Sequence, residues 1–303
     1  MNMEAQQIII TGGTGFIGSY LTKMFLREGH YLSILTRSPE KYSENQAENL
    51  RYIGWDQDLE ESMEKADVVI NLAGENLFGK RWTESVKKRI YESRIESTRA
   101  LVEAIEKANE KPELFISASA VGIYGDRGDD VLDEDTPPAD DFLAKVCKDW
   151  EAESKKAEDL DIRVANPRIG IVLESDGGFL QLMKIPFLLF LGGQLGDGEQ
   201  YIPWIHMDDL CRGIRYPMEN EEISGPYNVC SPNPEKMKNL AKAMGNVLNR
   251  PSFFRVPEFA INLLLGEAST AAMSSLRVQP KILQQAGFDF NYEDLEVALG
   301  DVL

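Results

Sequence analysis

Residues 8–21 read IIITGGTGFIGSYL, an apolar run that leads into a glycine-rich turn. The isoleucines predict a buried strand over residues 7–11, and the pattern after the turn predicts an amphipathic helix over residues 16–28. Gly12, Gly15 and Gly18 follow the strand in a GxxGxxG spacing. A glycine motif that directly follows a strand and opens a helix is typical of a dinucleotide-binding site.

Each glycine of this turn has its own physical reason. Gly12 allows the tight turn, Gly15 lets the backbone approach a pyrophosphate, and Gly18 lets the helix pack closely on the sheet. The helix N-terminus then presents free N–H groups and the positive end of its dipole to the phosphates. The alternative is a glycine-rich turn without a ligand, which the strand–turn–helix context disfavours. The residues expected to contact a cofactor here are Gly12, Thr14, Gly15, Phe16, Ile17 and Gly18.

The next predicted strand ends at Thr36, Arg37 and Ser38, about twenty residues beyond the glycines. Sites that prefer NAD(H) usually carry an acidic residue here, which accepts hydrogen bonds from the ribose hydroxyls. No acid stands beside Arg37, and an arginine can pair with a 2′-phosphate through two hydrogen bonds. The sequence therefore predicts NADP(H) as the cofactor, with NAD(H) less favoured. An ordinary surface arginine at the end of a strand is the alternative.

Short apolar runs alternate with longer amphipathic runs in the first half of the chain. The predicted strands, each apolar enough to be buried on both faces, are residues 7–11, 31–36, 68–72, 114–118 and 162–165. The helices predicted among them are residues 16–28, 83–108 and 143–158. This alternation predicts an α/β fold of the Rossmann type, a doubly wound parallel sheet with helices on both faces.

The pattern changes after about residue 171. Residues 176–200 are rich in glycine and apolar residues and predict a loop with a short helix. Within them, residues 192–198 are either a mobile flap over a cleft or plain turns. The later predicted helices are residues 208–220, 234–248, 257–265 and 279–299, the last interrupted at Gly287.

These patterns predict two units. Residues 1–170, with parts of 200–230, are expected to form the NADP(H)-binding Rossmann domain. Residues 171–303 are expected to form a smaller C-terminal α/β substrate lobe, which includes a helical module at about 250–300. The substrate cleft is expected between the two.

The acidic composition of the chain limits the kinds of molecule that it is expected to bind. The chain has 303 residues with 50 acidic and 32 basic side chains, a formal net charge of -18. Such a surface repels nucleic-acid phosphates and anionic lipids, so we expect neither nucleic acid nor membrane as a partner. We expect a small-molecule substrate of unknown identity, and a homodimer is the one assembly that we consider.

Cysteine and histidine usage limits the chemistry and the compartment. The three cysteines have no CxxC spacing and only two histidines are present, so neither a disulfide framework nor a metal site is predicted. The N-terminus lacks a secretory signal pattern, and the longest apolar stretch, residues 185–191, is too short to span a bilayer. The cytoplasm is the expected location.

Further motifs resemble those of the short-chain dehydrogenase/reductase superfamily on its extended, epimerase-like side. They are the sequence NLAG at residues 71–74, Trp55-Asp56, SASAVGIYG at residues 117–125, WIHMDDL at residues 204–210 and YNV at residues 227–229. The resemblance implies that Asp56, Leu72, Ala73 and Gly74 lie on the adenine side of the cofactor. It implies that Ser119, or Ser117 in the other register, is the catalytic serine. Ser117 and Arg168 are also expected among the cofactor-binding residues.

More narrowly, the chain is similar to an atypical subgroup known as epimerase family proteins. The features shared with it are residues 93–95, 117–126 and 142–144, Cys147 with Trp150-Glu151, and residues 168–170. The C-terminal part resembles the small module of unknown function that this subgroup carries. Most members have no assigned reaction, so the resemblance implies a fold and a cofactor rather than a substrate.

The acid/base pair of the superfamily is absent. Its chemistry uses a Tyr-x-x-x-Lys pair in which the lysine lowers the tyrosine pKa. None of the ten tyrosines has a lysine four residues on, and Leu143 and Cys147 stand at the expected places. Ser119 remains. Tyr124 is either a substitute proton carrier or a packing residue, and His206 is either catalytic or an orienting residue before the helix that begins near Asp208.

Other candidates stay open in the same way. Cys147 is read as a small packing residue rather than a nucleophile, because nothing beside it lowers its pKa. Arg94 or Arg168 binds an anionic substrate or neutralises a local acid. The leading hypothesis is an NADP(H)-binding oxidoreductase or epimerase acting on an unknown small carbonyl or sugar-type substrate. A non-catalytic NADP(H)-sensing regulator is the alternative.

Overall fold

The computed structural model describes residues 4–55, 59–77 and 81–303. Its strands are β1 (Gln7–Thr11), β2 (Tyr31–Thr36), β3 (Leu50–Gly54), β4 (Val68–Asn71), β5 (Leu114–Ser117), β6 (Ser119–Ala120), β7 (Val131–Leu132), β8 (Arg163–Ile169), β9 (Ile171–Leu173), β10 (Gly193–Leu195), β11 (Tyr201–Ile202), β12 (Trp204–His206), β13 (Gly225–Val229), β14 (Glu235–Lys236), β15 (Phe254–Val256) and β16 (Arg277–Val278). Its α-helices are α1 (Phe16–Arg27), α2 (Leu59–Met63), α3 (Glu84–Lys107), α4 (Phe142–Lys155), α5 (Gly178–Leu188), α6 (Met207–Glu219), α7 (Met237–Leu248), α8 (Glu258–Leu265), α9 (Ala268–Met273), α10 (Lys281–Gln285) and α11 (Leu295–Val302). Short 3-10 helices cover η1 (Pro39–Asn45), η2 (Val121–Tyr124) and η3 (Lys156–Leu160).

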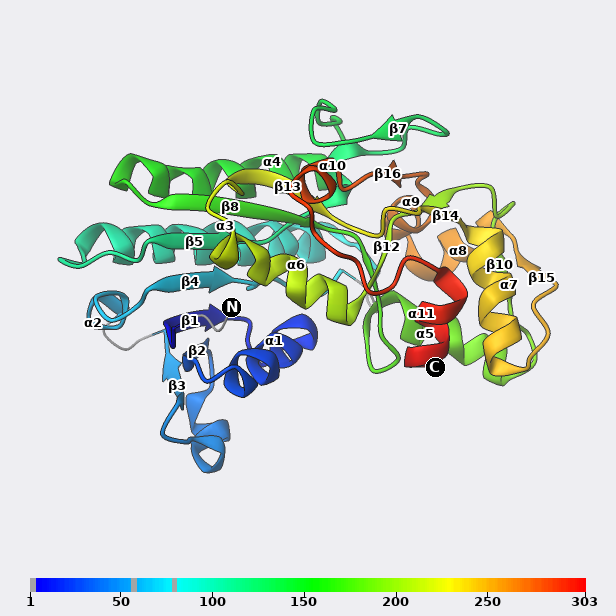
Figure 1. Cartoon of the computed structure of the whole chain (residues 1–303). Helices are drawn as coiled ribbons and strands as arrows, with labels where there is room; N and C mark the ends of the chain where they lie inside the picture. The colour runs from blue at the N-terminus through cyan, green and yellow to red at the C-terminus, as the bar shows by residue number, and fades with distance from the viewer. Residues whose placement is uncertain (1–3, 56–58, 78–80) are drawn as a thin grey trace.

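The main sheet is parallel throughout and has the strand order β13–β8–β5–β4–β1–β2–β3 (Figure 1). The short strand β6 pairs with β8 beyond the end of β5. The chain winds outward from β1 through β2 to β3, and then returns to the other side of β1 at β4. This reversal is the topological switch point at which parallel α/β sheets bind their ligands. The predicted fold class, a Rossmann-type doubly wound sheet with a smaller C-terminal lobe, is confirmed.

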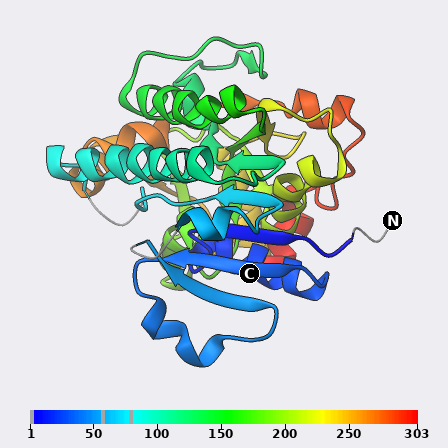
Figure 2. The ribbon, with the colours of Figure 1, turned by 90° about the vertical axis from the view of Figure 1, so that its left-hand side faces the viewer.

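Helices cover both faces of the sheet because alternate side chains of each strand point to opposite faces. Ile8 and Ile10 pack in the core formed with α1 and α6, whereas Ile9 packs in the core formed with α3. Helix α4 runs beside α3 (Figure 2). Strands buried in this way must be apolar throughout, which is why the sequence predicted β1, β2, β4 and β5 within a residue of their ends.

Two strands differ from the prediction. Strand β3 was missed, since this edge strand is short and carries the exposed Arg51 among its five residues. Strand β8 was predicted to stop at residue 165 but continues to Ile169, although it contains Pro167 and the charged Arg168. Pro167 has no N–H group to donate to a neighbouring strand. It lies opposite the break between β5 and β6, where neither strand pairs with it.

The C-terminal lobe forms its own core beside the carboxyl edge of the sheet. Helices α5, α7 and α11 enclose Trp204 there, together with Phe187 and Leu240. Residues 193–195, predicted as a flap or a turn, form strand β10, which pairs with β15 in parallel. No helix in the described ranges is long and apolar enough to cross a bilayer.

The predicted helix over residues 279–299 is two helices, α10 and α11, with non-helical chain between them. The break is wider than the predicted interruption at Gly287. Its cause is the fully buried carboxylate of Asp209, which accepts the backbone N–H groups of Asn291 and Tyr292, both at 2.9 Å. These N–H groups are therefore not available to a helix.

Candidate functional site

The glycine-rich turn can be built only from glycine at two positions. Gly12 has φ +68°, and a Cβ atom on it would lie 2.7 Å from the carbonyl oxygen of Leu72. A Cβ atom on Gly18 would lie 2.1 Å from the carbonyl oxygen of Gly12. The N–H of Gly15 donates to that same oxygen at 2.9 Å and closes the turn. Helix α1 therefore starts in direct contact with the end of β1.

The N-terminus of α1 is open to an anion. Gly15 is its N-cap, no described side chain caps it, and its first turn holds no acidic residue. Thr14 and Gly15 are exposed, while Phe16 and Ile17 are half-buried. Uncapped N–H groups at the positive end of a helix dipole favour a phosphate.

Arg37 stands directly after β2, the neighbour of β1, so it lies at the same carboxyl edge as the glycine-rich turn. Its side chain is exposed and forms no ion pair with the described residues. Residues 36–38 hold no acid that could neutralise it. An unpaired guanidinium at this place suits a phosphate group on the adenosine ribose.

On the other side of β1, the chain leaves β4 at the predicted adenine-side residues. Leu72 and Ala73 are half-buried and Gly74 is exposed. The N–H of Leu72 donates to the Thr11 carbonyl at 3.1 Å, and the N–H of Ala73 donates to Thr11 Oγ1 at 3.2 Å. These bonds hold residues 72–74 along the edge of β1. Asp56, the other predicted adenine contact, lies outside the described residues.

Ser117 lies inside the sheet rather than at its edge. It is fully buried, and its hydroxyl accepts a hydrogen bond of 3.1 Å from Asn71 Nδ2. The same amide donates to Thr98 at 2.8 Å, and its oxygen accepts from Thr11 at 2.7 Å. This network fixes β1, β4, β5 and α3 to one another, so in the structure Ser117 acts as a link between elements.

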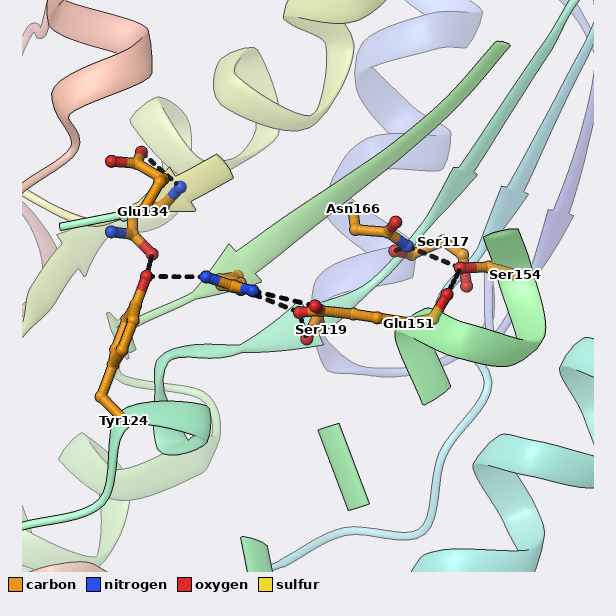
Figure 3. Close-up of polar contacts among 9 residues, drawn as sticks. Ser117, Ser119, Tyr124, Glu134, Glu151, Ser154 and Asn166 are labelled. Carbon is orange, nitrogen blue, oxygen red and sulfur yellow. Dashed lines mark hydrogen bonds and ion pairs between the residues drawn. The ribbon is translucent and has the colours of Figure 1, made fainter. Parts of the chain in front are cut away.

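Ser119 belongs to a second, charged network, drawn in Figure 3. Its hydroxyl donates to Glu151 Oε1 at 2.6 Å. Arg168 donates to the same carboxylate through Nε and Nη2, at 2.8 and 2.9 Å. Arg168 Nη1 donates to the Tyr124 hydroxyl at 3.0 Å, and that hydroxyl donates to Asn228 Oδ1 at 2.7 Å. Strands β6, β8 and β13 and helix α4 each contribute one of these side chains.

The charges in this network are fixed by their partners. Burial opposes the charge of Arg168, but the hydrogen bonds to Glu151 outweigh burial and raise the arginine pKa. Burial raises the pKa of Tyr124 to about 12, even though Arg168 acts against it. Burial likewise raises the pKa of Cys147 to about 12. At neutral pH both groups are therefore protonated, and neither Tyr124 nor Cys147 supplies an anionic base or nucleophile.

His206 performs the orienting role that the sequence left open. Its Nδ1 accepts the N–H of Asp208 at 3.1 Å and so caps α6. Its ring stacks on Tyr292 with centroids 3.6 Å apart, and its Nε2 lies 3.2 Å from Asp301. These contacts join α6 to the C-terminal segment rather than to the network around Ser119.

Arg94 also has a structural setting. It donates to the carbonyls of Ile90 and Glu75 at 2.9 and 3.2 Å and lies over the Trp150 ring. Burial lowers its pKa. Its guanidinium lies directly below Gly74, where a Cβ atom would approach it to 3.1 Å. Arg94 therefore supports the edge that follows β4.

The role of Glu151 emerges only from the structure. The signal that could have revealed it is Arg168, a charged side chain inside a buried strand, which requires a buried carboxylate as partner. Glu151 was noted only as part of the Trp150-Glu151 feature shared with the subgroup, and nothing in the sequence indicated which side chains it would contact. Within the described residues, no cluster of His, Cys, Asp or Glu could hold a metal ion.

Three features define the class of protein to which this chain belongs. They are the parallel sheet, the glycine-rich turn at its switch point and the retained serine. The chain is an atypical short-chain dehydrogenase/reductase, with a Glu–Arg pair beside the serine and without the Tyr-x-x-x-Lys pair. The chain belongs to the NAD dependent epimerase/dehydratase family, whose model matches residues 8–230. A domain of unknown function, DUF1731, matches residues 256–302.

Similar proteins agree with this assignment. The epimerase family protein YfhF of Bacillus subtilis is 41% identical over 300 residues, which cover 98% of this chain and 97% of that protein. A chloroplastic SDR39U1 homologue of Arabidopsis thaliana is 37% identical, with 99% of this chain and 88% of that protein covered. The crystal structure of human SDR39U1 (isoform 2) with NADPH superimposes with a TM-score of 0.89 at 30% identity, covering 98% of each chain.

Proposed function

We propose that this protein binds NADP(H) in preference to NAD(H) and transfers hydride between it and a small carbonyl, alcohol or sugar-type substrate. The observation that carries the cofactor preference is the exposed Arg37, which has no ion pair with the described residues and stands at the same edge as the N-terminus of α1, where no described side chain forms a cap. The structure of the human relative was determined with NADPH, which supports the same choice.

The residues present fit such a cofactor. The first turn of α1 and residues 12–18 would hold the pyrophosphate, because no described side chain caps the N–H groups at the start of α1 and no acidic residue stands in its first turn. Arg37 would pair with the 2′-phosphate, and residues 72–74 would border the adenosine side. The substrate would lie between this edge and residues 171–303. When bound, the nicotinamide supplies hydride transfer.

The acid/base device of this chain would be Ser119 with Glu151. Ser119 has one proton and donates it to Glu151, so its oxygen is left as an acceptor for a substrate hydroxyl. In alcohol oxidation, the substrate hydroxyl proton would pass to the Ser119 oxygen while the serine proton passes to Glu151. Arg168 donates one hydrogen bond to each oxygen of the Glu151 carboxylate and so holds it in place beside Ser119.

One observation favours a non-catalytic NADP(H)-sensing protein as the second candidate. Ser119 is only 2% exposed and Tyr124 is fully buried, so neither hydroxyl is presented freely to a substrate. A sensor would need only the cofactor edge, and would have to bind the oxidised and reduced cofactor with different affinities.

Titration with NADPH, NADP, NADH and NAD, followed by tryptophan fluorescence, tests the cofactor proposal. We expect NADPH to bind far more tightly than NADH, and Arg37→Ala to weaken NADPH about tenfold to a hundredfold with NADH unchanged. Arg27→Ala, which removes an exposed arginine at the far end of α1, is the matched control. Equal binding of NADPH and NADH by the unchanged protein would refute the preference.

A panel of alcohols, ketones and nucleotide sugars, followed by NADPH absorbance and by solvent deuterium entering substrate carbon, then separates the two candidates. Turnover that Glu151→Gln abolishes, with NADPH affinity unchanged, supports the enzyme. Tight NADPH binding without turnover of any compound supports the sensor instead.

A further inference from the structure

Helix α5 is apolar on both sides, although only one side is covered. Phe179, Leu180, Met183 and Phe187 are buried in the core of the C-terminal lobe. On the opposite side, the exposed fractions of Leu182, Ile185 and Leu188 are 41%, 53% and 49%. Apart from Gln181 and Lys184 the helix is apolar, whereas the exposed side of an ordinary surface helix is polar. Much of the outer side of α5 therefore has no cover from the described residues of the single chain.

Two adjoining segments continue this apolar surface. Leu189, Phe190 and Leu191 follow α5 and are 65%, 58% and 55% exposed. Phe253 and Phe254 are 78% and 39% exposed and lie beside them, since the N–H of Phe254 donates to the Gly192 carbonyl at 3.2 Å. The Arg250 guanidinium lies 4.6 Å from the Phe190 ring centroid. The α5 face is defined here as Leu182, Ile185, Leu188, Leu189, Phe190, Leu191, Phe253 and Phe254.

Phe190 places an aromatic side chain on the α5 face although its backbone conformation is unfavourable for a bulky residue. Its φ is +62°, the left-handed region that glycine adopts readily and that a bulky residue enters only with strain. A glycine would make the same turn at lower cost. Strained side chains of this kind are retained where they have contacts to make.

The size of the α5 face matches one side of a dimer. A fully exposed side chain of this size presents about 150–200 Å², so the exposed fractions of the eight residues correspond to roughly 700–900 Å². The largest apolar patch on a typical monomer is about 300–600 Å², whereas each partner in a standard protein interface contributes about 800 Å².

The absence of carboxylates around the α5 face indicates which kind of partner can bind there. Residues 177–196 and 249–257 contain no acidic residue, and carry Lys184, Arg250 and Arg255, although the whole chain has a net charge of -18. Two copies of so acidic a chain repel each other unless they meet where carboxylates are absent. An anionic lipid surface is disfavoured, because it would repel the rest of the chain.

We propose that the α5 face is the contact between two copies of this chain, with α5 of one copy against α5 of the other across a twofold axis. The same patch then serves both partners, as in the isologous interfaces of most homodimers.

Sedimentation velocity of the full chain from about 1 µM to about 50 µM tests this proposal. We expect a species of twice the 34.0 kDa chain mass. Ile185→Glu and Phe253→Glu should each raise the dimer dissociation constant at least tenfold, because each brings a carboxylate into the contact. The matched control is Val131→Glu, which changes a side chain 56% exposed on β7, outside this face.

Phe190→Gly gives a test that misfolding cannot imitate. Relief of the strained φ should raise the melting temperature measured under monomeric conditions, while loss of the aromatic group should weaken the dimer. A protein that stays monomeric at every concentration would overturn the proposal, as would association unchanged by the variants of this face. Flotation of a monomer with phosphatidylcholine–phosphatidylserine vesicles would overturn it as well, and would assign the face to lipid.

Discussion

The hydroxyl of Ser119 lies 2.6 Å from Oε1 of Glu151 and donates its only proton to that carboxylate. Arg168 holds the carboxylate from the other side with two hydrogen bonds. The serine oxygen can therefore only accept a further hydrogen bond while Glu151 is ionised. The resemblance implied a serine that acts with a tyrosine and a lysine, whereas the structure gives it a glutamate and an arginine as partners.

Glu151→Gln should destabilise the protein by about 3 kcal/mol, because it leaves the guanidinium of Arg168 buried without its counter-charge. Combining it with Arg168→Gln should cost less than the sum of the two single changes, since the double variant holds no unpaired charge. Urea unfolding of all three variants measures this coupling. Exposed Glu158→Gln, on the η3 turn that follows α4, should stay within about 0.5 kcal/mol. Additive single changes would show that the pair is not coupled.

The buried hydroxyl of Tyr124 predicts a loss of stability at high pH. Its pKa is raised from 10.0 to about 12 in the folded protein. The protonated hydroxyl therefore makes its full contribution to the free energy of unfolding below about pH 10. That contribution, about 2–3 kcal/mol, is lost as the pH rises from about 10 to about 12, because the unfolded chain ionises first. Tyr124→Phe should therefore flatten the fall of the unfolding free energy over this range. Tyr31→Phe, at an exposed tyrosine, should leave the slope unchanged.

Gly18→Ala should destabilise the fold by about 2–3 kcal/mol and weaken nucleotide binding, because the added methyl group would overlap the Gly12 carbonyl. Gly300→Ala is the matched control, because it adds the same methyl group at a place in α11 where a Cβ meets no atom within 4 Å. That change should stabilise the helix by about 0.5–1 kcal/mol. Thermal unfolding of the two variants should shift in opposite directions, and a shift of both to lower temperature would contradict this reasoning.

The buried carboxylate of Asp209 predicts that the packing of residues 286–303 depends on a single side chain. Asp209→Asn replaces one acceptor oxygen with an NH₂ group that opposes the N–H of Asn291 or Tyr292, at a cost of about 2–3 kcal/mol. Hydrogen exchange should rise in residues 286–303 first. Its neighbour Asp208 is exposed and accepts a hydrogen bond from the Asn291 side chain rather than from the backbone, so Asp208→Asn should change little. Equal effects of the two variants would refute the anchoring role of Asp209.

Much of the fold was predictable because parallel strands buried on both faces must be apolar along their whole length. Strands β1, β2, β4 and β5 follow this rule, and helices α1, α3 and α4 show the amphipathic pattern of helices that cover a sheet. The alternation of the two patterns predicted the Rossmann class. Strand β3 was missed because it is short and carries the exposed Arg51. The extension of β8 was missed because its proline and arginine indicated the end of a strand.

The sequence by itself determined the glycine-rich edge at which we propose that the cofactor binds. Its glycines, its uncapped helix start and Arg37 all lie within one strand–turn–helix–strand segment, so their spacing along the chain fixes their spacing in space. Only the tertiary structure decided the rest of the site. Ser119, Glu151 and Arg168 come from three elements that meet when β6 and α4 pack against β8, and a hydrogen bond between such elements depends on packing that no local pattern records.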